Sequence, residues 1–129
     1  MGYFFCQPCA GTSSSSGSTA GKYLSAELPA GTTTSFAPAG FPGTAAAPIG
    51  RLDLVPAGAA TLDSLAPGIT DGQEVILRNA SATQTITIPT AGSGTAPFTG
   101  GGGGVILPPL TAVTATWYAG SFNEWVLQQ

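Results

Sequence analysis

The chain has 129 residues, of which only 7% are charged, and its formal net charge at neutral pH is −3. A chain of this length fits one domain, which buries roughly two-thirds of its extended surface around a single core. With three basic residues in all, it lacks the basic patch that binds nucleic acid or anionic lipid, and no apolar run approaches the ~18 residues of a membrane-spanning helix. We therefore expect neither nucleic acid nor a membrane as a partner. So low a charge content favours instead a subunit whose surface is covered in an assembly.

Residues 1–21 are predicted to form an extended N-terminal arm. Apolar Tyr3, Phe4 and Phe5 precede a Ser/Gly/Thr tract, Gly11 to Gly21, that cannot bury enough surface to fold alone. We expect these three aromatic residues to be the partner-binding residues, buried against another protein. Fully extended, the arm spans about 70 Å, enough to reach a neighbouring subunit. The start lacks the basic region of a signal peptide, so we expect cytoplasmic synthesis.

Two cysteines in the arm, Cys6 and Cys9, have the CxxC spacing of redox centres and half zinc sites. A redox pair needs a helix N-terminus that lowers the thiol pKa, and the arm offers none. Zinc needs four ligands, and the chain has no His and no further Cys. We expect no cofactor and no metal, and a reduced or locally bridged pair. A metal shared between subunits remains the minority alternative.

Residues 22–129 are predicted to form a single β domain. Lys22 to Leu28 alternates modestly between polar and apolar residues, which indicates an edge strand, and Thr32 to Phe36 is expected to pair with it. The Pro/Gly/Ala-rich segment from Pro38 to Pro48 is predicted to be a surface loop.

The next segment, Arg51 to Val55, is predicted to be a strand that turns its leucines inward and Arg51 and Asp53 outward. The segment Thr61 to Leu65 is predicted to form one helical turn, capped by Thr61 and ended by the Pro-Gly that follows. No other segment indicates a helix.

The second half of the chain carries the strongest strand signals, which are short runs rich in Val, Ile, Thr and aromatics between Gly, Pro, Asn or Asp. These runs are Glu74 to Asn79, Gln84 to Pro89, Val105 to Leu107, Val113 to Tyr118 and Glu124 to Leu127. Alternation predicts one buried face, with Ile86 and Ile88 or Val113, Ala115 and Trp117 inward. Hairpins are expected at Asn79–Thr83 and at Gly120–Asn123. The predicted fold is all-β: a small antiparallel β-sandwich or open barrel behind the arm.

This succession also carries a resemblance. DGQEVILRNAS, QTITIP, a glycine-rich loop, VILPP, TATWY and a final NEW resemble the compact β domains of tailed-bacteriophage virion proteins. Such domains occur in capsid decoration (cement) proteins, head fibres and tail-fibre tips, commonly as trimers. The resemblance covers the part of the chain from Asp71 onward, and it implies a structural protein of the virion.

Enzymatic interpretations find little support. Without His, the chain lacks Ser/His/Asp and Cys/His arrangements and the usual catalytic metal sites. Each of its central carboxylates falls at a turn or on the polar face of a strand, where a solvated role is the default. These carboxylates are Asp53, Asp63, Asp71 and Glu74. We expect no enzyme.

Three further features have simple structural interpretations. The glycines from Gly100 to Gly104 lack the Lys and helix of a phosphate-binding loop and indicate a permissive bend. Asn79-Ala80-Ser81 fits a glycosylation sequon but is interpreted as the hairpin turn. Trp117 and Trp125 could line a glycan site, and their alternation favours the core.

The leading hypothesis for function is a capsid decoration protein of a bacteriophage. It would be a homotrimer on the capsid surface of the virion, bound through its arm to the major capsid protein or another virion protein, and would stabilise the assembled head without any reaction. The alternative is a tip module of a head or tail fibre that recognises a glycan or protein on the host surface.

Overall fold

The computed structural model describes residues 22–90, 96–100, 103–120 and 123–128, and within them the chain forms eleven strands and no helix. The strands are β1 (Lys22–Leu28), β2 (Gly31–Thr33), β3 (Ile49–Pro56), β4 (Ala60–Leu62), β5 (Ser64–Leu65), β6 (Glu74–Asn79), β7 (Ile86–Pro89), β8 (Ala96–Gly100), β9 (Gly104–Leu107), β10 (Ala112–Tyr118) and β11 (Glu124–Gln128). The all-β prediction is confirmed.

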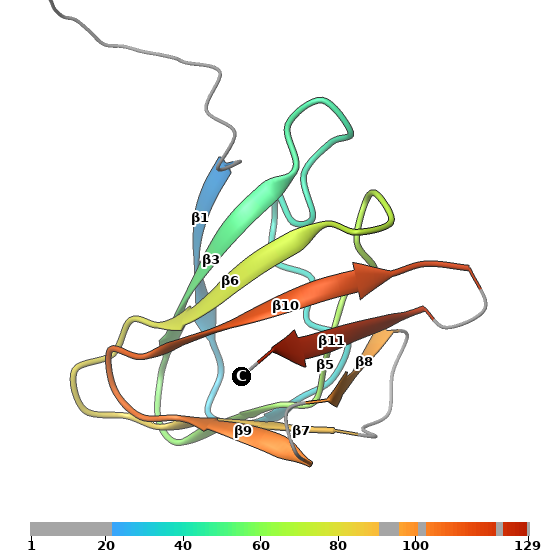
Figure 1. The fold of residues 1–129 in the computed structure, drawn as a ribbon. Coiled ribbons are helices and arrows are strands. Elements are labelled where there is room, and N and C mark those ends of the chain that lie inside the picture. The colour runs from blue at the N-terminus through green and yellow to red at the C-terminus, as the bar shows by residue number, and fades with distance from the viewer. Residues whose placement is uncertain (1–21, 91–95, 101–102, 121–122, 129) are drawn as a thin grey trace, which may run out of the picture.

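The strands are divided between two sheets, which face each other as a sandwich (Figure 1). The larger sheet has seven strands in the order β1-β3-β6-β10-β11-β8-β5, and the smaller has four in the order β2-β4-β7-β9. The expected edge position of Lys22–Leu28 is confirmed, because β1 ends the larger sheet.

The pairing is mixed, whereas an antiparallel sandwich was expected. β10 is antiparallel to β6 and β11, and β7 to β9, but β1–β3, β3–β6, β8–β11, β2–β4 and β4–β7 are parallel. Chain order explains the parallel pairs, because the chain crosses to the opposite sheet between their strands: β1 leads through β2 to β3, and β2 leads through β3 to β4. A strand reached by such a crossover returns in the same direction and pairs in parallel.

Three local expectations are wrong. The segment after Pro29 does not pair with β1; its strand β2 lies in the smaller sheet, with Gly31 opposite Ala60 of β4. Thr61–Leu65 is not a helical turn but the two short strands β4 and β5, which bury Leu62 and Leu65 completely. Asn79–Thr83 is not a hairpin loop, since it connects β6 of one sheet to β7 of the other.

β10 and β11 form a hairpin at the position expected from Gly120 to Asn123. Among the described residues, no other two consecutive strands pair with each other in one sheet. Both turn residues have positive φ, 80° for Gly120 and 48° for Asn123. Gly103 and Gly104 also have positive φ, 99° and 133°, in agreement with the permissive bend predicted for this run.

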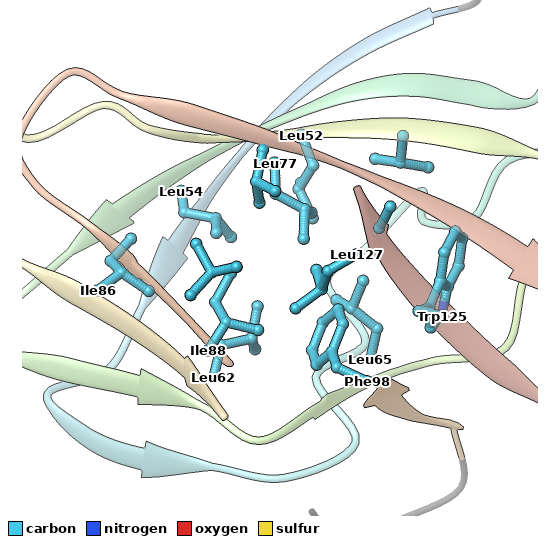
Figure 2. Close-up of a cluster of buried hydrophobic side chains, with 14 of the residues drawn as sticks. Leu52, Leu54, Leu62, Leu65, Leu77, Ile86, Ile88, Phe98, Trp125 and Leu127 are labelled. Carbon is cyan, nitrogen blue, oxygen red and sulfur yellow. The ribbon is translucent and has the colours of Figure 1, made fainter. Parts of the chain in front are cut away.

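A single hydrophobic cluster fills the space between the sheets (Figure 2). Leu52, Leu54 and Leu77 point into it from the larger sheet, and Ile86 and Ile88 from the smaller one. The alternation predicted for these strands is therefore confirmed. Both tryptophans are core residues, as predicted: Trp117 and Trp125 are 3% and 0% exposed, and their ring centroids lie 5.3 Å apart.

Candidate binding surface

The outward face of β1, β3 and β6 carries a cluster of polar and aromatic side chains. In the parallel register Tyr23 of β1 lies beside Arg51 of β3, and Arg51 beside Ile76 of β6. Two residues further along the strands, on the same face, lies a second row of Ser25, Asp53 and Arg78. Since partners in a sheet share a face, burial of Leu52 and Leu54 on the core side turns Arg51 and Asp53 outward, as the sequence predicts.

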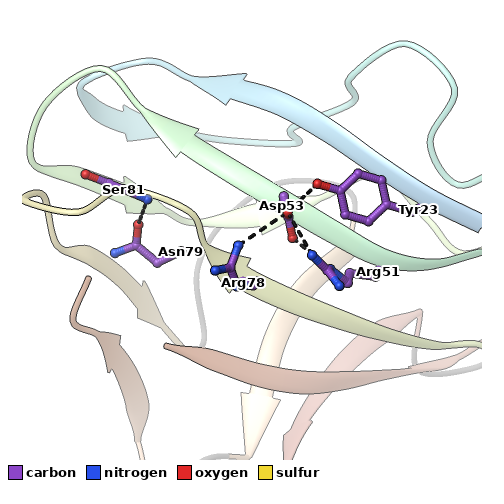
Figure 3. A network of polar contacts seen from close by, with 6 residues as sticks. All are labelled: Tyr23, Arg51, Asp53, Arg78, Asn79 and Ser81. Carbon is purple, nitrogen blue, oxygen red and sulfur yellow. Dashed lines mark hydrogen bonds and ion pairs between the residues drawn. The ribbon is translucent and has the colours of Figure 1, made fainter. Parts of the chain in front are cut away.

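Asp53 is the centre of this cluster (Figure 3). The Tyr23 hydroxyl donates to Oδ2 at 2.6 Å, Arg51 donates from Nε at 3.0 Å and from Nη2 at 3.2 Å, and Arg78 donates from Nη1 at 3.4 Å. These partners cover the carboxylate, so that Asp53 is only 3% exposed although it lies on the outer face. The expected solvated role of this carboxylate is therefore wrong.

Electrostatics hold the cluster in one protonation state. Hydrogen bonding from Arg51 is the main reason why the pKa of Asp53 lies below its ordinary value, against the opposing effect of burial. The hydrogen bond to the Asp53 carboxylate raises the pKa of Tyr23, because it favours the neutral phenol. At neutral pH two guanidinium groups therefore share one carboxylate, and the cluster keeps one net positive charge.

The aromatic and basic side chains of this cluster remain accessible. Tyr23 is 56% exposed, and the side chains of Arg51 and Arg78 are 43% and 34% exposed. The guanidinium carbon of Arg51 lies 4.5 Å from the centroid of the Tyr23 ring, a cation–π contact that fixes the two side chains relative to each other. We call Tyr23, Arg51, Asp53 and Arg78 the arginine cluster.

The row that contains Tyr23 and Arg51 continues across the sheet. Ile76 of β6 pairs with Thr114 of β10, and Thr114 pairs with Gln128 of β11. Ile76, Thr114 and Gln128 also line an open groove of ≈ 440 Å³, whose other wall is β9 with the 66% exposed Ile106. The arginine cluster and the groove are thus connected along one row of the outer face.

Other residues singled out in the sequence are not part of this surface. Tyr3, Phe4, Phe5, Cys6 and Cys9 lie outside the described residues. Of the remaining carboxylates, Asp63 accepts a hydrogen bond from Thr34 and Asp71 one from the Ala119 amide, far apart in the chain, while Glu74 is an exposed residue of β6. Within residues 22–90, 96–100, 103–120 and 123–128, no group of three or more His, Cys, Asp or Glu side chains forms a metal site.

The same described ranges contain no helix long and apolar enough to cross a membrane.

The sequence shows only part of the arginine cluster. Arg51 and Asp53, two residues apart on one face, are a visible signal for an ion pair. Tyr23 lies 30 positions and Arg78 lies 25 positions from Asp53 along the chain. Their convergence depends on the parallel pairing of β1, β3 and β6, which the sequence pattern did not predict.

Comparison with known proteins gives one family. The model of a family described as "Phage depolymerase C-terminal beta sandwich domain" matches residues 33–125. No curated protein and no solved structure matches the chain. The matched range contains Arg51, Asp53 and Arg78, whereas Tyr23 and the rest of β1 precede it.

Proposed function

Because the chain belongs to the family of phage depolymerase C-terminal β-sandwich domains, and is thus a β-type domain of a phage virion protein, we propose that it is a recognition module of a tail or fibre protein. In this proposal the module binds a saccharide of the host surface and performs no reaction. The binding surface is the outward face of β1, β3 and β6.

The observation that carries the proposal is the arginine cluster. An exposed aromatic ring beside fixed hydrogen-bond donors suits a sugar, whose ring presents apolar C–H groups on its faces and hydroxyls at its edge. Asp53 holds Tyr23 and Arg51 in place from below, at 2.6 Å and 3.0 Å. Donors that are already oriented lose little conformational entropy when a ligand binds, which is the basis of preorganised sites.

The family membership favours this fibre-type function over a capsid decoration protein, which was the leading hypothesis from the sequence. A decoration protein would attach through Tyr3, Phe4 and Phe5 to the major capsid protein, and would need no accessible site on the β domain. The arginine cluster gives the β domain such a site. Both functions place the protein on the virion, and only the decoration function requires the capsid surface.

A screen of the full chain against an array of bacterial surface saccharides tests the proposal. We expect binding to at least one saccharide class, and loss of that binding in Tyr23→Ala, which removes the exposed ring. Ile69→Ala is the matched control, because Ile69 is a 41% exposed apolar residue outside the strands. Bound saccharide should keep its chain length. Release of new reducing ends, or no binding on the array, would contradict the proposal.

We also propose that the protein is a homotrimer, in line with its low charge. The exposed Ile106 of edge strand β9 lies in the groove and is the strongest apolar candidate for a subunit contact. Sedimentation at micromolar concentration should show a trimer that Ile106→Glu dissociates and that Ile69→Glu leaves intact. A monomeric wild-type protein, or dissociation by Ile69→Glu instead, would contradict this assignment.

A further inference from the structure

We infer that the saccharide bound by the outer face is an acidic one, whose carboxylate groups pair with Arg51 and Arg78. This inference rests on the proposed function and specifies the substrate class of the same site. It follows from the charge, the free donors and the row geometry of the arginine cluster.

Positive charge is concentrated in the arginine cluster. The protein has a net charge of −3 and only three basic residues, yet two of them meet in this cluster. Asp53 lies within 3.0 Å of Arg51 and 3.4 Å of Arg78 and compensates one of the two charges. The remaining positive charge is carried by side chains that are 43% and 34% exposed, where an anionic ligand can reach it. Glu27 and Glu74 lie on the same face of β1 and β6, so the position that favours an anion on this face is limited to the two guanidinium groups.

The two guanidinium groups have more N–H donors than Asp53 engages. A guanidinium group has five N–H donors in a planar fork, and Asp53 engages Nε and Nη2 of Arg51 but only Nη1 of Arg78. More donors are therefore present than Asp53 uses. A carboxylate is the acceptor that fits the fork in a bidentate manner. The exposed fractions of 43% and 34% leave both side chains within reach of a ligand.

The outer face is extended in one direction beyond the arginine cluster. The row from Tyr23 through Arg51, Ile76 and Thr114 to Gln128 crosses five neighbouring strands in register. Adjacent strands lie about 4.8 Å apart, so the row is about 19 Å long. A row of this length suits an extended polymer rather than a single sugar, with a carboxylate at the arginine cluster and the rest of the polymer over Ile76 and Thr114.

The test compares two probes of equal length, a galacturonate oligosaccharide and the corresponding neutral galactose oligosaccharide, by calorimetry with the full chain. We expect the galacturonate probe to bind at least about tenfold more tightly, as removal of a charged hydrogen-bond partner implies. Its affinity should fall as salt is raised from low to physiological concentration. This salt titration uses the wild-type protein and depends on no variant.

Variants then locate the binding. Arg51→Gln and Arg78→Gln should each weaken galacturonate binding about tenfold. Arg51→Lys should give an intermediate affinity, because it keeps the charge and loses the planar fork. Lys22→Gln removes the same unit of charge from β1, at a position separated from Tyr23 by an irregularity in the register and without a contact to Asp53. It should change the affinity less than about twofold, the size expected of a screened surface charge.

The outcomes separate this inference from the proposed function. Tight binding of the neutral probe, or of only neutral saccharides on the array, overturns the acidic class and leaves the recognition function standing. Equal binding of inorganic polyphosphate shows a response to charge alone and also overturns the inference. Absence of binding to every saccharide on the array overturns both. An equal loss of affinity in Lys22→Gln and Arg51→Gln would remove the arginine cluster as the site.

Discussion

Asn79 is the residue on which the corner between the two sheets depends. Its side chain is fully buried, and its Nδ2 donates to the carbonyls of Gln84 at 2.8 Å and Leu107 at 3.0 Å, while its Oδ1 accepts from the Ser81 amide at 3.0 Å. The sequon at this position therefore has a structural role, because its amide nitrogen is enclosed by the corner.

We expect Asn79→Ala to lower the free energy of unfolding by about 3 kcal/mol, since it leaves buried backbone groups without partners. Urea denaturation measures this change. Asn79→Asp is the isosteric comparison: it keeps the acceptor for Ser81 but places an acceptor oxygen, in place of the donor Nδ2, against two carbonyls, so it should be at least as destabilising. An aspartate variant as stable as the wild type would contradict this role.

Asp53 makes stability depend on pH in the acid range. Its pKa is lowered in the folded state, mainly by Arg51, so its contribution is complete above the unfolded value of about 3.9 and is lost as pH falls through the folded pKa. The melting temperature of the wild type should exceed that of Asp53→Asn at neutral pH, and the difference should shrink below about pH 4.

Tyr23 makes stability depend on pH in the alkaline range, which serves as a control for the effect of Asp53. Its raised pKa means that the stabilisation is complete below about pH 10 and is lost as pH rises further. Tyr23→Phe should remove this alkaline decline and leave the acid one in place. A difference between wild type and Asp53→Asn that persists unchanged to pH 2 would show that the Asp53 carboxylate has no such linkage.

At the scale of elements, the segment between β5 and β6 packs closely against Trp117 of β10 at Gly68. A Cβ atom at Gly68 would lie 2.4 Å from Cγ of Trp117 and 2.8 Å from its Cβ. These atoms belong to the buried indole ring of Trp117 and to the Cβ atom that carries it, which have little freedom to move.

We expect Gly68→Ala to cost about 3 kcal/mol, the upper end of the range for overpacked sites, and to change the near-ultraviolet circular dichroism of the tryptophans. Gly72→Ala is the matched control in the same connection. Its Cβ would meet open space, but its φ of 89° is strained for alanine, so it should cost about 1 kcal/mol without a change in the aromatic signal. Equal effects on that signal would contradict the proposed clash.

Local sequence pattern predicted most strands and their inward faces, because polar and apolar residues alternate along them, as around Leu52 and Leu54 or Ile86 and Ile88. This alternation can be seen without knowledge of which strands pair. The pairing of strands was not predictable in the same way. Whether Asn79 begins a hairpin or a crossover depends on Leu107 and Gln84, whose carbonyls its side chain binds, and Leu107 lies 28 positions away. The helical turn expected at Thr61 fails because β7 and β8 provide ladders for this segment.

At the scale of the whole molecule, we expect the β domain from residue 22 onward to fold without residues 1–21. The buried hydrophobic residues of the described chain run from Leu28 to Leu127, so deletion of residues 1–21 should leave the far-ultraviolet sheet signal and the melting temperature unchanged. As a recognition module the shortened protein should still bind saccharide. Loss of sheet signal would contradict the division at residue 22. If the shortened protein folds but no longer binds phage particles from which the protein has been removed, the decoration function and its anchors Tyr3, Phe4 and Phe5 would be favoured instead.

The order of strands in the larger sheet has a consequence for how the protein folds. Apart from the β10–β11 hairpin, its ladders join strands that are distant in the chain, and proteins dominated by such non-local pairings fold in milliseconds to seconds. β5 and β8 connect to the rest of this sheet only through β11, within the described residues. Until Glu124–Gln128 is in place, β5 and β8 therefore have no pairing with the other strands of the larger sheet, so the sheet is completed only when β11 pairs with both β10 and β8.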